Sequence, residues 1–198
     1  MQMTHEFGLW CVGIMSRWSK DLRRARLRFA AAFVAVGGAL LALYSFPYSE
    51  HGLGEAGFAW YLGAYARVAG AVIHLADPTV RVLGAELVGR TSLTIAKNCD
   101  AMDVNLLLTA AMIAFPAPWK RRLLGIVAGV GLLSVVNVLR IVTLYQINIH
   151  APRAFEFVHA EVFPLAMVAL AVGAFGLWSR WSRQAEPAPT DTPAHAQA

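Results

Sequence analysis

Long apolar runs alternate with short polar or charged segments along this chain, and the apolar runs set the predicted elements. Several runs of about 17 to 25 residues are long enough to cross a hydrocarbon core as helices. We predict four such spans near residues 29–47, 101–118, 122–148 and 160–179. This pattern predicts an all-α polytopic integral membrane protein with about four transmembrane helices.

Basic residues gather at one end of these spans, and this asymmetry predicts the topology. A basic block, Arg17 to Arg28, precedes the first span, Lys120 to Arg122 follow the second, and Arg180 and Arg183 follow the fourth. Positively charged flanks mark the cytoplasmic side of a membrane. We therefore predict that both termini are cytoplasmic.

A fifth apolar run, residues 56–76, does not fit this count. Arg67 lies at its centre, Gly63 and Gly70 weaken it as a helix, and a fifth crossing would reverse the order set by the basic flanks. We predict that the run forms an outer interfacial or re-entrant helix. Its aromatic residues suit that depth.

Residues 77–98 show a hydrophobic period that is shorter than that of a helix. Val80-Arg81-Val82 and Ser92 to Ala96 alternate in the manner of strands and are separated by Gly84 and Gly89. A short extracytoplasmic β-hairpin that leads to the head of the second span is expected.

Three regions follow from this division. Residues 1–28 form a cytoplasmic basic segment, 29–183 a membrane-embedded catalytic domain, and 184–198 a disordered cytoplasmic tail rich in Pro and Ala. Met15 is an alternative start that N-terminal sequencing would distinguish from Met1.

Composition supports the membrane class, with 58% hydrophobic and 15% charged residues, where soluble chains carry about 25% charged. The net charge of +5 would suggest nucleic acid in a soluble protein, but here the basic residues flank apolar runs, so no nucleic acid partner is predicted. Two cysteines, Cys11 and Cys99, make no disulfide framework and no metal-ligand spacing, and no cofactor is predicted.

Cys99 is the first candidate for chemistry because it lies where the second span begins. Free N–H groups and the helix dipole at such a position favour a thiolate. Asp100 and Asp103 oppose it by like charge, so a cation is required nearby. The alternative is a buried, inert cysteine.

Arg140 is the second candidate. It lies 18 residues beyond Arg122, about 27 Å along a helix, close to the outer boundary. Asn137 and Ser134 share its face at three-residue spacing. The alternatives are an arginine that reaches to the outer headgroups and an asparagine that joins helices.

His159, at the outer start of the last span, is the third candidate, and a simple interfacial histidine is its alternative. His150 competes but lies beside Pro152 in a predicted loop, and His74 and His51 are weaker. A cysteine, an arginine and a histidine at one membrane face form the inventory of a Cys–His acyl-transfer site with a cationic oxyanion stabiliser. No G-x-S-x-G or H-E-x-x-H motif is present.

On Cys99, Asn137-Val138-Leu139-Arg140-Ile141 and His159, the chain resembles the exosortase/archaeosortase family, and is similar to its short exosortase H subgroup. The resemblance covers about residues 58–180. In many members a small residue or glycine shortly follows the cysteine, whereas here Asp100 and Ala101 do.

The resemblance implies a membrane-embedded cysteine transpeptidase in which Cys99 is the nucleophile, Arg140 the substrate or oxyanion residue, and His159 the acid/base. Asn137 and Asn98 are expected to support the site or contact substrate. The implied partners are exported proteins that carry a C-terminal sorting signal of motif, transmembrane helix and basic cluster, together with membrane lipids. A purely hydrolytic membrane protease and a non-enzymatic assembly protein remain alternatives.

Overall fold

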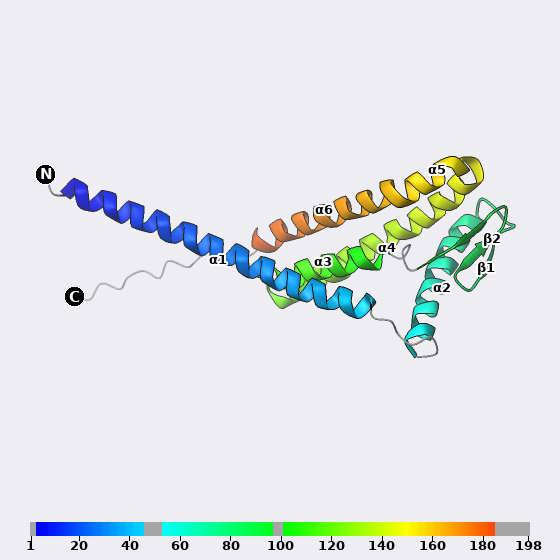
Figure 1. The fold of residues 1–198 in the computed structure, drawn as a ribbon, viewed down its shortest axis with the longest axis horizontal. Helices are drawn as coiled ribbons and strands as arrows, with labels where there is room; N and C mark the ends of the chain where they lie inside the picture. The colour runs from blue at the N-terminus through cyan, green and yellow to red at the C-terminus, as the bar shows by residue number, and fades with distance from the viewer. Residues whose placement is uncertain (1–2, 46–52, 97–100, 185–198) are drawn as a thin grey trace.

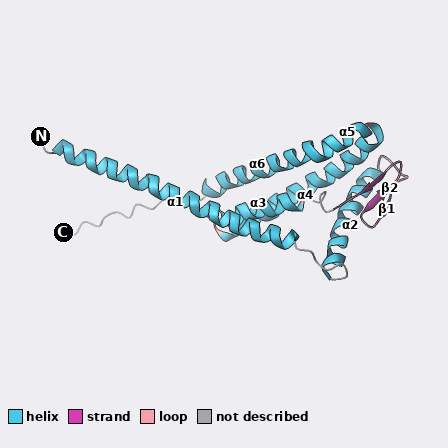
Figure 2. Cartoon of the chain, viewed as in Figure 1, coloured by secondary structure: helices cyan, strands magenta, loops and turns pink. Residues whose placement is uncertain are grey.

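The computed structural model describes residues 3–45, 53–96 and 101–184, and shows a long helical bundle with a small sheet at one end (Figures 1 and 2). In chain order the elements are α1 (Met3–Ser45), α2 (Leu53–His74), β1 (Arg81–Leu83), β2 (Glu86–Val88), β3 (Ser92–Thr94), α3 (Met102–Ala114), α4 (Trp119–His150), α5 (Pro152–Phe157), the π-helix η2 (Val158–Val162) and α6 (Phe163–Gln184).

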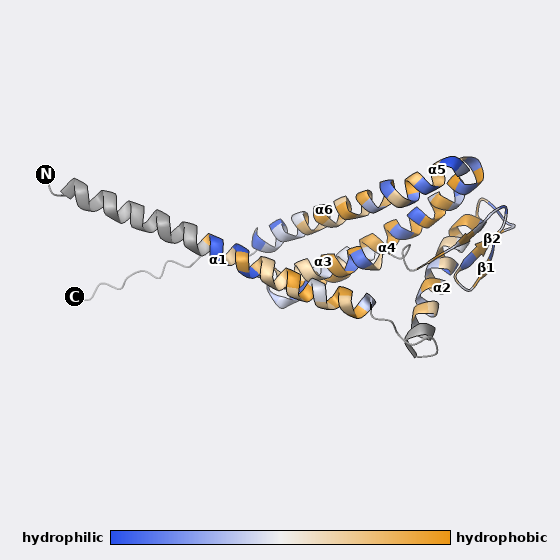
Figure 3. Ribbon diagram, in the orientation of Figure 1, coloured by the Kyte–Doolittle hydropathy of each residue, from blue (hydrophilic) through white to orange (hydrophobic). Residues whose placement is uncertain are grey.

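Three described segments are long and apolar enough to cross a membrane: Leu22–Ser45, Trp119–His150 and Pro152–Arg183. Their hydropathy and the large apolar side chains exposed on them confirm a polytopic helical membrane protein (Figure 3). The span predicted at 101–118 is shorter than expected. It forms α3, a helix of 13 residues, about 20 Å long, and alone it does not reach across a hydrocarbon core of about 30 Å.

Prolines explain this short helix. Phe115 precedes Pro116 and adopts an extended conformation, with φ −76° and ψ 134°, which ends α3. Pro118 then stands directly before α4, at whose start its fixed φ is compatible with a helix. Arg122 donates to the carbonyls of Phe115 and Ala117, at 3.0 and 3.3 Å, so the reversal between α3 and α4 is tied by hydrogen bonds.

The helices alternate in direction (Figure 1): α1 and α4 run towards the sheet, and α3 and α6 run back. The predicted basic flanks of α4 and α6 thus lie at the end away from the sheet. There they also hold the bundle together, because Arg121 donates to the Ser182 carbonyl at 3.1 Å and Trp178 Nε1 donates to the Arg121 carbonyl at 3.1 Å.

Two hydrophobic cores follow one another along α4. One is built by α3, α6 and the first half of α4, and includes Leu108, Leu133 and Met167; the other, around Leu87 and Tyr145, is built by α2, the sheet and the second half of α4. The change from one core to the other falls between Leu133 and Ile141, where the chain carries polar residues.

A strand hairpin is present as predicted, but the two predicted strand segments do not pair with each other: they form the outer strands β1 and β3, and β2 lies between them. The sheet is antiparallel in the order β1-β2-β3. The turn from β1 to β2 uses Gly84, with φ +63°, as a two-residue hairpin requires at its first central position. The middle strand, β2, has only three residues between two glycines, too few for alternation to reveal it.

Helix α2 lies on this sheet. Gly70 allows the close approach, since a Cβ there would meet the side chains of Val82 and Leu87. Within the described chain α2 is not among the segments that length and composition mark as able to span; that 56–76 does not cross stays a prediction. Its depth at the outer interface remains a prediction.

Candidate active site

Arg140 lies on the buried face of α4. Gly125, Gly129, Leu133 and Asn137 occupy this face at intervals of four residues, and Arg140 follows with 5% of its surface exposed. The two glycines lie against α6 and α3, as expected for close helix packing. A charged side chain turned into the protein from an apolar helix indicates a specific partner or a cavity.

That partner is His159. Arg140 Nη2 lies 3.4 Å from His159 Nδ1 and 3.5 Å from the His159 carbonyl oxygen, and the guanidinium lies 5.7 Å from the centre of the Phe163 ring. Arginine has donors only. When Nδ1 accepts from Arg140, a neutral His159 therefore carries its ring proton on Nε2.

A π-helical turn presents the His159 carbonyl to Arg140. In η2 the N–H of Phe163 donates to the Val158 carbonyl rather than to His159. The next residue, Pro164, has no N–H to offer. The His159 carbonyl therefore lacks its usual helical donors, and Arg140 takes that place. Single π-turns of this kind are frequent at functional sites. Sequence reasoning missed the turn, although Pro164 was a signal for it.

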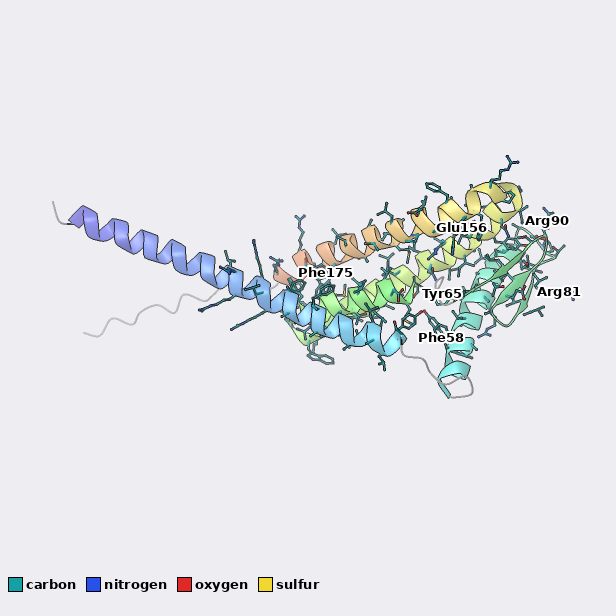
Figure 4. All side chains as sticks on the ribbon, viewed as in Figure 1. Phe58, Tyr65, Arg81, Arg90, Glu156 and Phe175 are labelled. Carbon is teal, nitrogen blue, oxygen red and sulfur yellow. The ribbon has the colours of Figure 1, made fainter. Side chains whose placement is uncertain are left out.

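His159 also forms part of a groove of about 420 Å³ at the sheet end of the bundle. Its ring stacks on Phe155, with centroids 5.6 Å apart. One side of the groove is β3, and the opposite side carries Phe155, Glu156 and His159. Figure 4 places Glu156 near the corner between α4 and α6, close to the sheet. The volume falls in the range of small-ligand sites, about 300 to 1,000 Å³.

The structure thus brings together two of the predicted site residues, Arg140 and His159. Cys99 and Asn98 lie outside the described residues, as does Asp100. Asn137 is fully buried one turn before Arg140, whereas Asp103 is exposed in the first turn of α3. Ser134, on the predicted polar stripe, accepts a hydrogen bond of 3.2 Å from Tyr65 of α2.

The competing histidines lie elsewhere. His150 is exposed at the end of α4, and His74 is exposed at the end of α2. Over the described ranges, no group of three or more His, Cys, Asp or Glu side chains is arranged to hold a metal ion.

A second polar cluster, which the sequence did not reveal, joins α4 to the sheet. Asp77 is buried and accepts from the Thr79 hydroxyl at 2.6 Å and from Tyr145 at 3.3 Å, while Arg90 lies 3.7 Å away. The Thr79 hydrogen bond is the main reason that the pKa of Asp77 lies below its ordinary value of 3.8, and burial opposes the shift. The cluster fixes the sheet against α4, which forms one side of the groove.

Comparison with known proteins assigns the family. No curated protein and no solved structure matches the chain. The sequence pattern of the transmembrane exosortases matches residues 53–179, well over half of the 198 residues, and this stretch contains α2, the sheet, Arg140 and His159. The chain therefore belongs to the transmembrane exosortase family.

Proposed function

We propose that this protein is a membrane-embedded cysteine transpeptidase in which Cys99, Arg140 and His159 carry the chemistry. The observation that supports it most is the contact of Arg140 with both Nδ1 and the carbonyl of His159, beside a groove. Family membership supports a membrane protein-sorting transpeptidase. An arginine at such a site can stabilise an oxyanion, and the histidine can carry a proton.

The proposed reaction has two steps. The Cys99 thiolate attacks a backbone carbonyl of the substrate, so that an S–C bond forms and the carbonyl oxygen gains a negative charge, which Arg140 stabilises. The C–N bond then breaks, and the His159 imidazolium, which formed when the histidine took the thiol proton of Cys99, gives a proton to the leaving amine and becomes neutral. An incoming amine or water attacks the thioester, returns a proton to His159 and releases the thiolate.

The substrates are exported proteins with a C-terminal sorting signal of short motif, transmembrane helix and basic cluster. Cleavage takes place near the motif, on the outer side of the cytoplasmic membrane, and the product passes to an acceptor in the cell envelope. Asn137 and Asn98 support the site. The position of the site on the outer side is inferred from the basic flanks of the helices, which also predict that both termini are in the cytoplasm.

The test is co-expression with a tagged protein from the same genome that ends in such a signal. Wild-type protein is expected to shorten the tagged protein, and Cys99→Ala to leave it intact at equal expression. Processing by Cys99→Ala at the wild-type rate would contradict the proposal, and unchanged function of Cys99→Ser would favour an assembly role. Mass spectrometry of the new C-terminus separates transfer, which leaves an added group, from hydrolysis.

A further inference from the structure

The edge of the sheet that borders the groove is β3. Among the described residues, the order β1-β2-β3 leaves β3 with a strand neighbour on one side only. Its other side opens into the groove, which is lined by Ser92 to Ala96 along the strand. Edge strands present rows of N–H and C=O groups that another extended chain can pair with.

The hydrogen-bond register decides which groups point into the groove. Gly89 N–H donates to the Thr91 carbonyl at 3.0 Å and Ile95 N–H donates to the Ala85 carbonyl at 2.9 Å, so Thr91 and Ile95 face β2. Successive residues of a strand alternate in direction. Ser92 and Thr94 therefore turn their N–H and C=O groups away from β2, towards the groove.

An independent contact agrees with this direction. Asn148 of α4 donates to the Ser92 carbonyl at 3.4 Å and to the Thr91 hydroxyl at 2.6 Å. The start of β3 is thus fixed to α4. Within the described part of the chain, no hydrogen bond occupies the N–H or C=O of Thr94.

We propose that the groove binds the substrate as an added strand, with the extended segment just outside its membrane helix paired to the edge of β3. This inference rests on the proposed function and specifies how that site holds its substrate. The Thr94 N–H and C=O are the central pair, and the N–H of Ser92 extends the row. Affinity comes from the main chain, as in other cases of strand addition.

Two features of the groove identify this occupant. First, β3 ends five residues before Cys99 in sequence, and His159 lines the same groove, so a chain paired with β3 shares the groove with His159. Second, the floor is formed by Ile141 and Leu144 of α4, which are 2% exposed. A peptide that enters such an apolar site loses water, and an edge strand replaces the lost hydrogen bonds.

The first test uses the unaltered protein. A series of peptides is made with the motif and membrane helix of a sorting-signal protein from the same genome. Each peptide carries a single N-methyl amide, and its position moves by one residue from peptide to peptide along the segment before the helix. Strand pairing predicts that processing falls about tenfold at the residue whose N–H meets the Thr94 carbonyl, where a hydrogen bond is lost, and changes little at the two residues beside it. Uniform sensitivity, or none, would overturn the inference while the unmethylated peptide is still processed. Failure to process the unmethylated peptide would overturn the proposed function itself.

The second test alters the edge. Thr94→Pro removes an N–H that points into the groove and leaves the β2–β3 ladder intact, and proline is compatible with an edge position of this kind. We expect kcat/KM to fall about tenfold, mainly through KM. Thr94→Ala is the matched control, because it removes the same exposed side chain and keeps the N–H. Equal losses in the two variants would contradict strand addition; if either variant does not accumulate, the N-methyl series decides.

Discussion

Arg140 makes contacts that a lysine would not reproduce. Its guanidinium reaches Nδ1 and the carbonyl of His159 together and also lies over the Phe163 ring. A lysine places one compact ammonium on a flexible stem and lacks the planar group that lies over the Phe163 ring. We therefore expect Arg140→Lys to fold and to lose about 100-fold in the rate of processing, the scale of losing an oxyanion donor.

The measurement is the rate of substrate shortening at matched amounts of protein in the membrane. Arg67→Lys is the control, since Arg67 is an exposed arginine of α2 in the same membrane protein. Processing by Arg140→Lys at the rate of Arg67→Lys would show that any cation at position 140 is sufficient.

Ala101 makes a separate prediction about stability. It is the only described non-glycine residue with a positive φ, +55°, and it stands directly before α3. A Cβ is disfavoured in this left-handed conformation, and glycine adopts it readily. Ala101→Gly is expected to stabilise the protein by about 0.5 to 1 kcal/mol.

A rise in the midpoint of thermal unfolding in detergent would confirm this. Ala110→Gly, inside α3 and fully buried, should instead lower the midpoint.

At the scale of elements, the contact between α4 and α6 depends on Gly125. A Cβ at this position would overlap the Trp178 indole, whose Nε1 donates to the Arg121 carbonyl. Gly131 lies in the same helix, and a Cβ added there would meet nothing within 4 Å. The two glycines therefore form a matched pair for substitution.

Gly125→Ala should destabilise the protein by about 1 to 3 kcal/mol, as overpacking does. Gly131→Ala should stabilise it by up to about 1 kcal/mol through helix propensity. Thermal unfolding of both variants in the same detergent is the measurement. A similar shift for both would mean that α4 and α6 do not pack through Gly125.

The Asp77 cluster predicts a pH dependence for the attachment of the sheet. Because the Thr79 hydroxyl lowers the pKa of Asp77, its carboxylate contributes stability that is fully present above the ordinary value of 3.8 and is lost as the pH falls through the lower folded value. Thermal unfolding between pH 7 and pH 3 should show a stability loss at the acid end. Asp77→Asn should be less stable at pH 7 and show a smaller acid loss; an unchanged acid loss would assign it to other groups.

The sequence predicted long elements better than short ones. The three long apolar segments emerged from their length, and Arg140 and His159 from their charge and position. The direct contact between these two residues could not be predicted, since it depends on a π-turn that moves the Phe163 N–H to Val158. Pro116 and Pro164 carried information on the end of α3 and on that turn, but a proline alone does not specify which irregular geometry follows. The three-residue strand β2 was too short to show a period.

At the scale of the whole molecule, the length of α4 separates a basic end from an end that carries the sheet. This helix has 32 residues, about 48 Å, which exceeds a hydrocarbon core of about 30 Å. Lys120 to Arg122 begin α4, and the sheet lies towards the other end of this helix (Figure 1), where β3 lines the groove. The basic flanks predict that the basic end is cytoplasmic, which would place the groove outside, where the proposed substrates arrive.

Single-cysteine labelling tests this orientation directly. In a Cys11→Ala, Cys99→Ala background, Arg81→Cys places a thiol on the exposed side of β1, labelled at the sheet end in Figure 4, and Trp119→Cys places one at the exposed start of α4. A membrane-impermeant maleimide should label Arg81→Cys in intact spheroplasts and Trp119→Cys only after lysis, because about 48 Å of helix separates the two ends. Labelling of both after lysis is the control for accessibility. The reverse pattern would place the groove in the cytoplasm, where an enzyme acting on exported proteins would not meet its substrates after export.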